Sequence, residues 1–217
     1  MDSYTVFPDK AISGHGPVAA AFLKLDIGRF LEACRCVHEL PYGYNSNMDD
    51  PMILFREKQG TCTTKHAVIG LLAAELDIPV VKTMGIYAMT ESIVSGTRAI
   101  VDRFDLPYVP MIHCFLRFGS FRVDLTEGNA NGKNRSLETF LHTEDVRPDI
   151  PERNEYLRYR AALKELVQNR KELQGVDLKR LLKAREEGLK LLKEKIRRQL
   201  DGSLPLAVQG RHSGPNV

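Results

Sequence analysis

Three residues of the types that thiol-based acyl transfer uses occur along the chain in the order Cys62, His113 and Asp124. A thiol can act as the nucleophile, an imidazole can take up and return its proton, and a carboxylate can orient the imidazole. These groups can react together only if the fold brings them into contact. The elements predicted around each residue therefore decide whether the pattern has chemical meaning.

Cys62 opens a predicted helix. Residues 62–76 place apolar side chains at helical spacing, which indicates a buried helix with Cys62 in its first turn. Unpaired amides and the helix dipole lower the pKa of a thiol there and can stabilise an oxyanion. Gln59, Gly60 and Thr61 form the predicted substrate and oxyanion region, in which Gly60 lets a substrate approach the backbone. The alternative is that Cys62 is a small buried hydrophobic residue, as most free cysteines are.

His113 and Asp124 belong to a predicted β-hairpin. Residues 111–125 alternate in character and are rich in aromatic and β-branched side chains around a two-residue turn at 119–120. This register places Phe115 opposite Asp124 and puts His113 on the same face. Their Cβ atoms are then diagonal neighbours about 7 Å apart, so the side chains can hydrogen-bond. A purely structural His–Asp pair is the alternative. The other opposing pairs of this register are Phe118 with Phe121 and Arg117 with Arg122.

Two runs of sequence resemble a known family. GTCTTKHAVIGLLAAELDIPVV (60–81) is similar to the nucleophile helix and following strand of the transglutaminase-like superfamily of papain-related cysteine enzymes, and HCFLRFGSFRVDLTEG (113–128) is similar to its His and Asp strands. The resemblance covers about residues 35–130. It implies Cys62 as the nucleophile, His113 as general base and then acid, and Asp124 as the group that orients His113. It also implies an α+β, papain-like core in which the nucleophile helix packs on an antiparallel sheet.

The chain departs from the family pattern in two places. Thr63 stands where an aromatic residue often follows the nucleophile, and the chain contains no Trp. An extra segment at 90–107 is predicted to form an inserted helix over the site. Both departures concern the substrate more than the chemistry.

Two further groups of residues have the composition of a ligand site. Cys34, Cys36 and His38 suggest a metal site, but Cys36 points away from the other two on a helix and no fourth ligand follows. The glycine-containing stretch 128–134 superficially resembles a phosphate loop, but its spacing and final residue do not fit. We therefore predict neither a metal nor a cofactor.

Two other residues lie close to the predicted triad in sequence. His66 lies one helical turn after Cys62 and is a rival base. A papain-like arrangement takes its imidazole from across the cleft, which favours a structural role for His66. Cys114 alternates to the face opposite His113 and is predicted to lie in the core.

The 217 residues are enough for one substantial core. We expect a transglutaminase-like core at 1–150, a basic helical arm at 151–201 and a disordered tail at 202–217. The N-terminal residues lack the pattern of a signal peptide, and the apolar runs are too short to span a membrane. With four cysteines, this predicts reduced thiols in the cytoplasm. Within residues 1–150 the patterns also predict a helix at 17–40, a strand at 79–87 and a short helix at 136–141.

Residues 152–200 contain 15 Lys and Arg against 8 Asp and Glu, so a chain of net charge +3 carries +7 here and −4 elsewhere. The simplest interpretation is a solvated helical hairpin whose apolar stripe docks on the core. A homodimer or protein partner held through a coiled-coil seam is the next possibility, and nucleic acid is disfavoured because both signs of charge are interleaved. The stripe predicted in the second helix is Leu178, Leu182, Arg185, Leu189, Leu192 and Ile196.

Together these patterns predict a cysteine-dependent acyl-transfer enzyme that acts on a peptide, amide or thioester substrate. Hydrolysis is favoured over transfer to an amine, because the sequence shows no feature for binding an amine or a coenzyme. The alternative from a different class is a binding or scaffold module on the same fold, in which the triad is present but unused.

Overall fold

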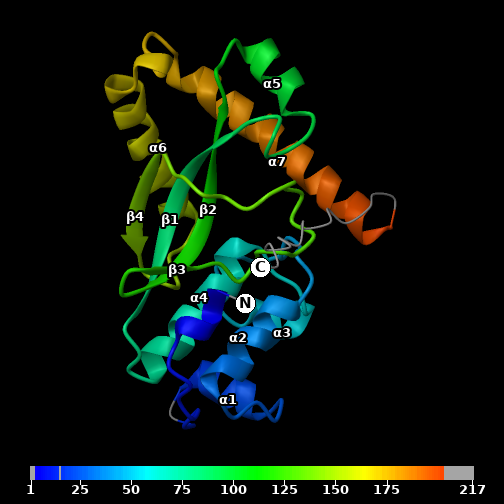
Figure 1. Ribbon diagram of the computed structural model, residues 1–217, viewed down its shortest axis with the longest axis vertical. Coiled ribbons are helices and arrows are strands. Elements are labelled where there is room, and N and C mark those ends of the chain that lie inside the picture. The colour runs from blue at the N-terminus through cyan, green and yellow to red at the C-terminus, as the bar shows by residue number, and fades with distance from the viewer. Residues whose placement is uncertain (1–2, 15, 203–217) are drawn as a thin grey trace, which may run out of the picture.

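The computed structural model describes residues 3–14 and 16–202 and has an α+β fold (Figure 1). The predicted tail, apart from Gly202, lies outside these residues. The strands are β1 (Val80–Met89), β2 (Val109–Phe118), β3 (Phe121–Val123) and β4 (His142–Val146). The helices are α1 (Pro17–Leu23), α2 (Phe30–Glu39), α3 (Ile53–Glu57), α4 (Cys62–Glu75), α5 (Thr97–Phe104), α6 (Glu152–Asn169) and α7 (Leu178–Leu200), with 3₁₀ turns η1 (Ser3–Val6) and η2 (Lys171–Leu173).

The sheet is antiparallel, with the strand order β3-β2-β1-β4. β1 and β2 pair over their whole length, from Val80 opposite Phe118 to Met89 opposite Val109. β3 pairs only with the last three residues of β2, so the rest of that edge of β2 is free of strand partners in the described structure. Helix α4 packs on β2 and places Cys62 against Cys114 of this strand.

Helix α4 packs on β1, β2, α1 and α2. It begins at Cys62, and the hydroxyl of Thr64 accepts a hydrogen bond from the Thr61 amide at 3.0 Å, which closes the first turn. Its apolar side chains join one hydrophobic core with the end of the hairpin, including Leu116 and Val123. The predicted helix at 62–76 and the predicted strand at 79–87 are therefore confirmed in type and place.

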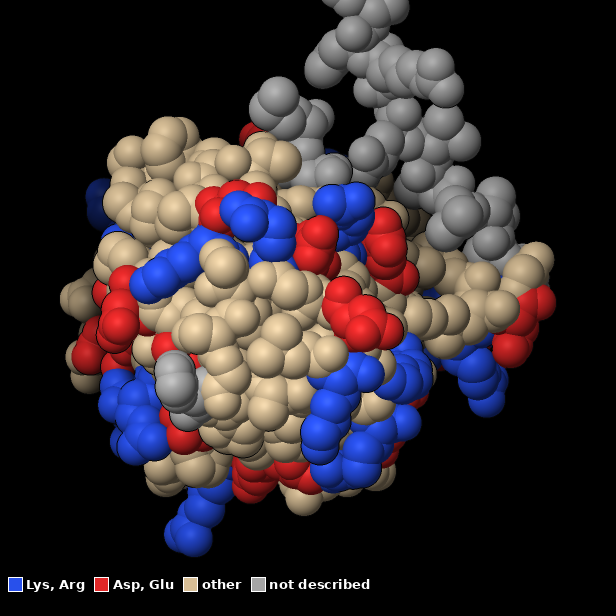
Figure 2. Space-filling view, turned by 90° about the horizontal axis from the view of Figure 1, so that it is seen from below, with Lys and Arg blue, Asp and Glu red and all other residues tan. Residues whose placement is uncertain are grey.

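Helices α1 to α4 gather at one end of the molecule, whereas α5 and most of α7 lie at the other (Figure 1). Seen from below, the first end has an area of uncharged residues surrounded by charges of both signs (Figure 2). None of the described helices combines the length and apolar composition needed to cross a membrane.

The basic helices α6 and α7 share a second hydrophobic core with α5, the C-terminal half of β1 and the N-terminal part of β2. The apolar stripe of α7 thus docks on the sheet of its own chain. Its buried residues differ from the predicted stripe, because α7 crosses the strands obliquely and buries small residues where it comes closest. A dimer through these helices stays a prediction and would use their exposed residues. The buried positions are Leu181, Ala184, Gly188, Leu192 and Ile196.

The prediction of a single helix at 17–40 is wrong, because α1 ends at Leu23 and α2 begins at Phe30. Between them Asp26 adopts a left-handed conformation with φ 58°, and the chain reverses. The amide of Phe30 then bonds the carbonyl of Lys10 at 2.9 Å. Phe22 and Phe30 are both fully buried, and the reversal allows both to enter the same core.

The prediction of a helix at 136–141 is also wrong, since this segment is extended and leads into β4. The Arg122 guanidinium donates hydrogen bonds to the carbonyls of Leu137 and Glu138, at 2.6 and 3.0 Å. The Phe140 ring lies in the space beside Gly85. Tertiary partners for these carbonyls and for Phe140 outweigh the local preference for a helical turn.

The inserted segment at 90–107 does contain a helix, α5, but its predicted position over the site is wrong. It contacts α7 and β2, and it lies at the end of the hairpin remote from α4 (Figure 1). The side chains of Ile100 and Leu106 in this segment are buried in the second hydrophobic core, which explains the position of α5.

Candidate active site

The three predicted catalytic residues meet at the free edge of β2. Cys62 is the first residue of α4, His113 lies in β2 opposite Gly85, and Asp124 follows directly after β3. The predicted hairpin register is confirmed for the pairs Phe118–Phe121 and Arg117–Arg122, with the turn between them.

The imidazole and the carboxylate form a direct hydrogen bond. His113 Nε2 lies 2.6 Å from Oδ2 of Asp124. The second oxygen, Oδ1, accepts hydrogen bonds from the amide and hydroxyl of Thr126, at 2.9 and 2.7 Å. Although burial acts in the opposite direction, the charge of His113 and these hydrogen bonds hold the pKa of Asp124 well below its usual value. The carboxylate is thus ionised and has one fixed orientation.

The other nitrogen of His113 is free for the thiol. His113 Nδ1 is buried and has no hydrogen-bond partner among the described residues. Despite burial, the charges of Asp124 and of a Cys62 thiolate raise the pKa of His113 to about 9. In turn, hydrogen bonding from Cys114 and the charge of His113 lower the pKa of Cys62 well below its usual value, against the effect of burial. The favoured state is a thiolate–imidazolium pair.

Cys114 belongs to this site, which sequence reasoning missed. It is fully buried, as predicted, but its Sγ lies 3.7 Å from Thr63 Oγ1 and 3.6 Å from Glu155 Oε2, and it packs against Cys62. Hydrogen bonding to Cys62 and burial raise its pKa well above the usual value, so Cys114 keeps its proton. Strand alternation does separate Cys114 from His113. Because α4 begins at an edge of β2 that β3 leaves free, Cys62 can reach both residues.

Both ring nitrogens of His66 are engaged in hydrogen bonds, which agrees with the structural role predicted for it. Its Nε2 accepts a hydrogen bond from the Leu125 amide at 2.8 Å, so its proton lies on Nδ1 and is donated to the Cys62 carbonyl at 2.6 Å. Burial lowers the pKa of His66 to about 4, so it is neutral near pH 7. With both nitrogens engaged, His66 ties the start of α4 to the residue after Asp124.

Gln59 and Gly60 support the start of α4 in ways the sequence did not indicate. Gln59 Nε2 donates to the Tyr44 carbonyl at 3.0 Å, which directs this side chain to the loop at 41–47. Gly60 is required by packing, since a Cβ atom there would lie 2.7 Å from the hydroxyl of Thr64. Thr61, which precedes the helix, is buried.

The predicted absence of a metal site at Cys34, Cys36 and His38 stays a prediction, but two of the side chains have other roles. Cys34 lies in the hydrophobic core, where burial raises its pKa far above the usual value. His38 Nδ1 lies 3.1 Å from the Leu125 carbonyl.

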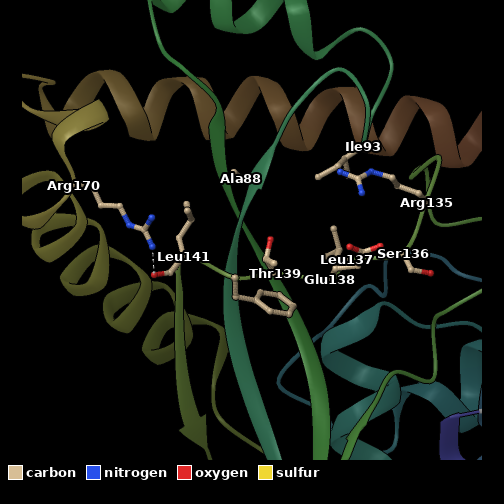
Figure 3. A pocket seen from close by; sticks show the side chains of 10 residues that line it. Ala88, Ile93, Arg135, Ser136, Leu137, Glu138, Thr139, Leu141 and Arg170 are labelled. Atoms are coloured by element: carbon tan, nitrogen blue, oxygen red, sulfur yellow. Dashed lines mark hydrogen bonds between the residues drawn. The ribbon is translucent and has the colours of Figure 1, made fainter.

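A pocket of about 240 Å³ lies beside β1 and is lined mainly by the segment that leads into β4 (Figure 3). Arg135 and Arg170 stand on opposite sides of it, and Arg170 donates a hydrogen bond to the Leu141 carbonyl at 3.1 Å. Phe140 lines this pocket and stacks on His113 with ring centroids 6.5 Å apart. The segment at 136–141 therefore supports one face of the His113 imidazole.

The contact between Gly85 and Phe140 yields a stability prediction. A Cβ atom at Gly85 would lie 2.4 Å from the Phe140 ring, so Gly85→Ala must displace an aromatic ring that is stacked on His113. We expect a loss of about 1–3 kcal/mol in the free energy of unfolding, measured by urea titration. Gly28→Ala is the matched control, because a Cβ atom there meets nothing within 4 Å. Equal stability of the two variants would contradict the prediction.

Comparison with protein-family models, with curated proteins and with solved structures found no match to this chain.

Proposed function

We propose that this chain is a cysteine-dependent acyl-transfer enzyme of the transglutaminase-like type, with a papain-like core and a hydrolytic activity on amides or thioesters. The observation that supports this most directly is the arrangement around His113. Its Nε2 is bound to the Asp124 carboxylate at 2.6 Å, its Nδ1 has no partner among the described residues, and the charge of His113 lowers the pKa of the Cys62 thiol. The Cys62 thiol, the His113 imidazole and the Asp124 carboxylate can thus act as nucleophile, base and orienting group.

The reaction follows from these positions. The Cys62 thiolate adds to the substrate carbonyl, and the resulting oxyanion is stabilised by the first-turn amides of α4, which have no intrahelical acceptor. His113 Nδ1 then gives its proton to the leaving amine or thiol as the carbon–heteroatom bond breaks, which leaves a thioester on Cys62. Water, deprotonated by His113, attacks the thioester, releases the acid and restores the thiol. An amine acceptor in place of water would make the enzyme a transferase.

The order of the elements supports the family assignment. The nucleophile opens a central helix, and the histidine and aspartate belong to adjacent strands of an antiparallel sheet on which that helix packs. A working thiol also requires a reducing compartment such as the cytoplasm, and all four cysteines are free.

The proposal predicts how the alkylation of Cys62 depends on pH. Its lowered pKa keeps the thiolate populated in mildly acidic solution. Iodoacetamide should therefore modify Cys62 at a nearly constant rate from pH 8.5 down to mildly acidic pH. Cys36 is an internal control, since burial and Glu39 raise its pKa and its alkylation should fall steeply over the same range. Mass spectrometry of the two peptides measures both rates. A Cys62 rate that falls in parallel with that of Cys36 would contradict the proposal.

Turnover, unlike alkylation, should fall at alkaline pH. His113 must be protonated to release the leaving group, and its pKa of about 9 means that this proton is present below pH 9 and lost above it. Hydrolysis should decline above pH 9, while the thiolate remains and alkylation continues.

One observation favours the second candidate, a binding module with an unused triad. Cys62 is only 7% exposed and packs against Tyr42 and Ile196, which cover it. In that case small alkylating reagents would still find an activated thiol, but acyl probes of peptide size would not acylate it. Screening peptide, amide and thioester libraries for an acyl-enzyme on Cys62 separates the two functions.

A further inference from the structure

Lys133 lies in the loop between β3 and β4, which several hydrogen bonds hold in place. The amide of Gly132, which has φ +79°, donates to Oε1 of Gln199 in α7 at 3.1 Å. The amide of Lys133 donates to Oδ1 of Asn131 at 3.0 Å, and the amide group of Asn131 binds the Thr126 carbonyl, also at 3.0 Å. The loop is thereby tied both to α7 and to the turn that follows the catalytic aspartate.

The ammonium group of Lys133 sits between two buried tyrosines beside Cys62. Its Nζ lies 5.7 Å from the ring centroid of Tyr42 and 6.0 Å from that of Tyr87. Tyr42 belongs to the same small buried cluster as Cys62 and Cys114. Within the described part of the chain, Lys133 forms no ion pair with a carboxylate. Lys133 is half-buried, and removing a cation from water without a paired anion is costly, so its contacts with the two tyrosine rings and nearby negative charge must compensate for the lost hydration.

The charges of the triad balance only with a further cation. The thiolate of Cys62 and the carboxylate of Asp124 carry two negative charges, and the imidazolium of His113 supplies one positive charge. Lys133 supplies the second, so these four groups together are neutral. In the tetrahedral intermediate the oxyanion replaces the thiolate and the balance is unchanged, because His113 keeps its proton until the leaving group departs.

We propose that Lys133 is a further catalytic residue, whose ammonium stabilises negative charge first on the Cys62 thiolate and then on the oxyanion formed at its acyl group. This inference rests on the proposed function. The charge of Lys133 contributes to lowering the pKa of Cys62. Burial lowers the pKa of Lys133 itself, and the charges of Cys62 and Asp124 oppose this shift.

Other titratable and charged groups face Cys62 from the elements around it, and their variants are not expected to reproduce the effect of Lys133. Tyr42, Tyr44 and Tyr87 have raised pKa values and are neutral at pH 7, as is His66. The groups that interact with Cys62 are His113 and Cys114 from β2, His66 from α4, Tyr42 and Tyr44 from the loop before α3, Tyr87 from β1 and Glu155 from α6. Asp124 after β3, Lys82 from β1 and Arg185 from α7 act on members of this set.

The test measures the alkylation of Cys62 against pH in Lys133→Met, which keeps the length of the side chain and removes its charge. We expect the midpoint of thiolate formation to rise by about one pH unit, so that alkylation at mildly acidic pH slows about tenfold. Lys133→Arg should retain most of the wild-type profile. Lys193→Met is the matched control, because Lys193 also lies over a tyrosine ring, 4.7 Å from the centroid of Tyr44, but is exposed.

The outcomes separate this inference from the proposed function. If the wild-type Cys62 profile has an ordinary midpoint near pH 8.5, both are overturned. If wild-type Cys62 is activated and Lys133→Met matches it, only the role of Lys133 is overturned. Should Lys133→Met fail to fold, as judged by circular dichroism, Lys133→Gln replaces it under the same criterion. Once a substrate is known, the loss should appear in kcat rather than KM.

Discussion

Cys62→Ala is expected to abolish formation of the acyl-enzyme and to reduce turnover of amide and thioester substrates by at least about 10⁴-fold. The physical reason is that the variant removes the only thiol that faces the unpartnered Nδ1 of His113 among the described residues. Cys114 cannot substitute for it, because its pKa is raised and it stays protonated. Intact-mass spectrometry after reaction with a thioester or acyl probe measures the loss directly.

The matched control for this experiment is Cys36→Ala. Cys36 is a half-buried thiol on α2, remote from the triad, so its loss should leave labelling and turnover at the wild-type level. Both variants should melt close to the wild-type temperature, since each replaces a thiol by a smaller apolar side chain. Full labelling of Cys62→Ala at another residue would show that Cys62 is not the nucleophile.

The second large effect is expected for Asp124→Asn, with a loss of about 10³- to 10⁴-fold in turnover. At Oδ1, Asp124 accepts hydrogen bonds from the amide and hydroxyl of Thr126. An asparagine must keep its carbonyl oxygen on that side, so its NH₂ group turns towards Nε2 of His113. Because this NH₂ group is a donor, the proton of a neutral His113 moves to Nδ1, which can then no longer accept the proton of Cys62.

The same variant should also change the protonation of the site. Without a carboxylate, the pKa of His113 should fall from about 9 towards its ordinary value of about 6.5. Cys62 would then lose its cationic partner, and its alkylation below pH 8 should slow with the loss of turnover. Asp145→Asn is the control, because Asp145 is exposed and pairs with Arg117 at 2.5 Å on the sheet surface. Asp124→Asn with the wild-type pH profile would contradict the assigned role of the carboxylate.

Parts of the fold that depend on local pattern were predictable. The helix from Cys62 and the hairpin register around the turn at 119–120 follow from hydrophobic periodicity and a two-residue turn, which act over a few neighbouring residues. The split between α1 and α2 and the extended segment at 136–141 were not predictable in this way. Both depend on distant partners, such as the backbone bond from Phe30 to Lys10 and the guanidinium of Arg122.

The sequence by itself determined which residue types could form a catalytic site and that His113 and Asp124 share one face of a hairpin. Strand alternation also separated Cys114 from His113. Only the tertiary structure decided that α4 begins at the free edge of β2, where Cys62 meets both His113 and Cys114. It also brought Lys133, from a loop after β3, to the tyrosines beside the thiol. The physical reason is that local periodicity fixes the face of a side chain within one element, whereas the position of a helix against a strand edge depends on long-range packing of α4, β2 and α7.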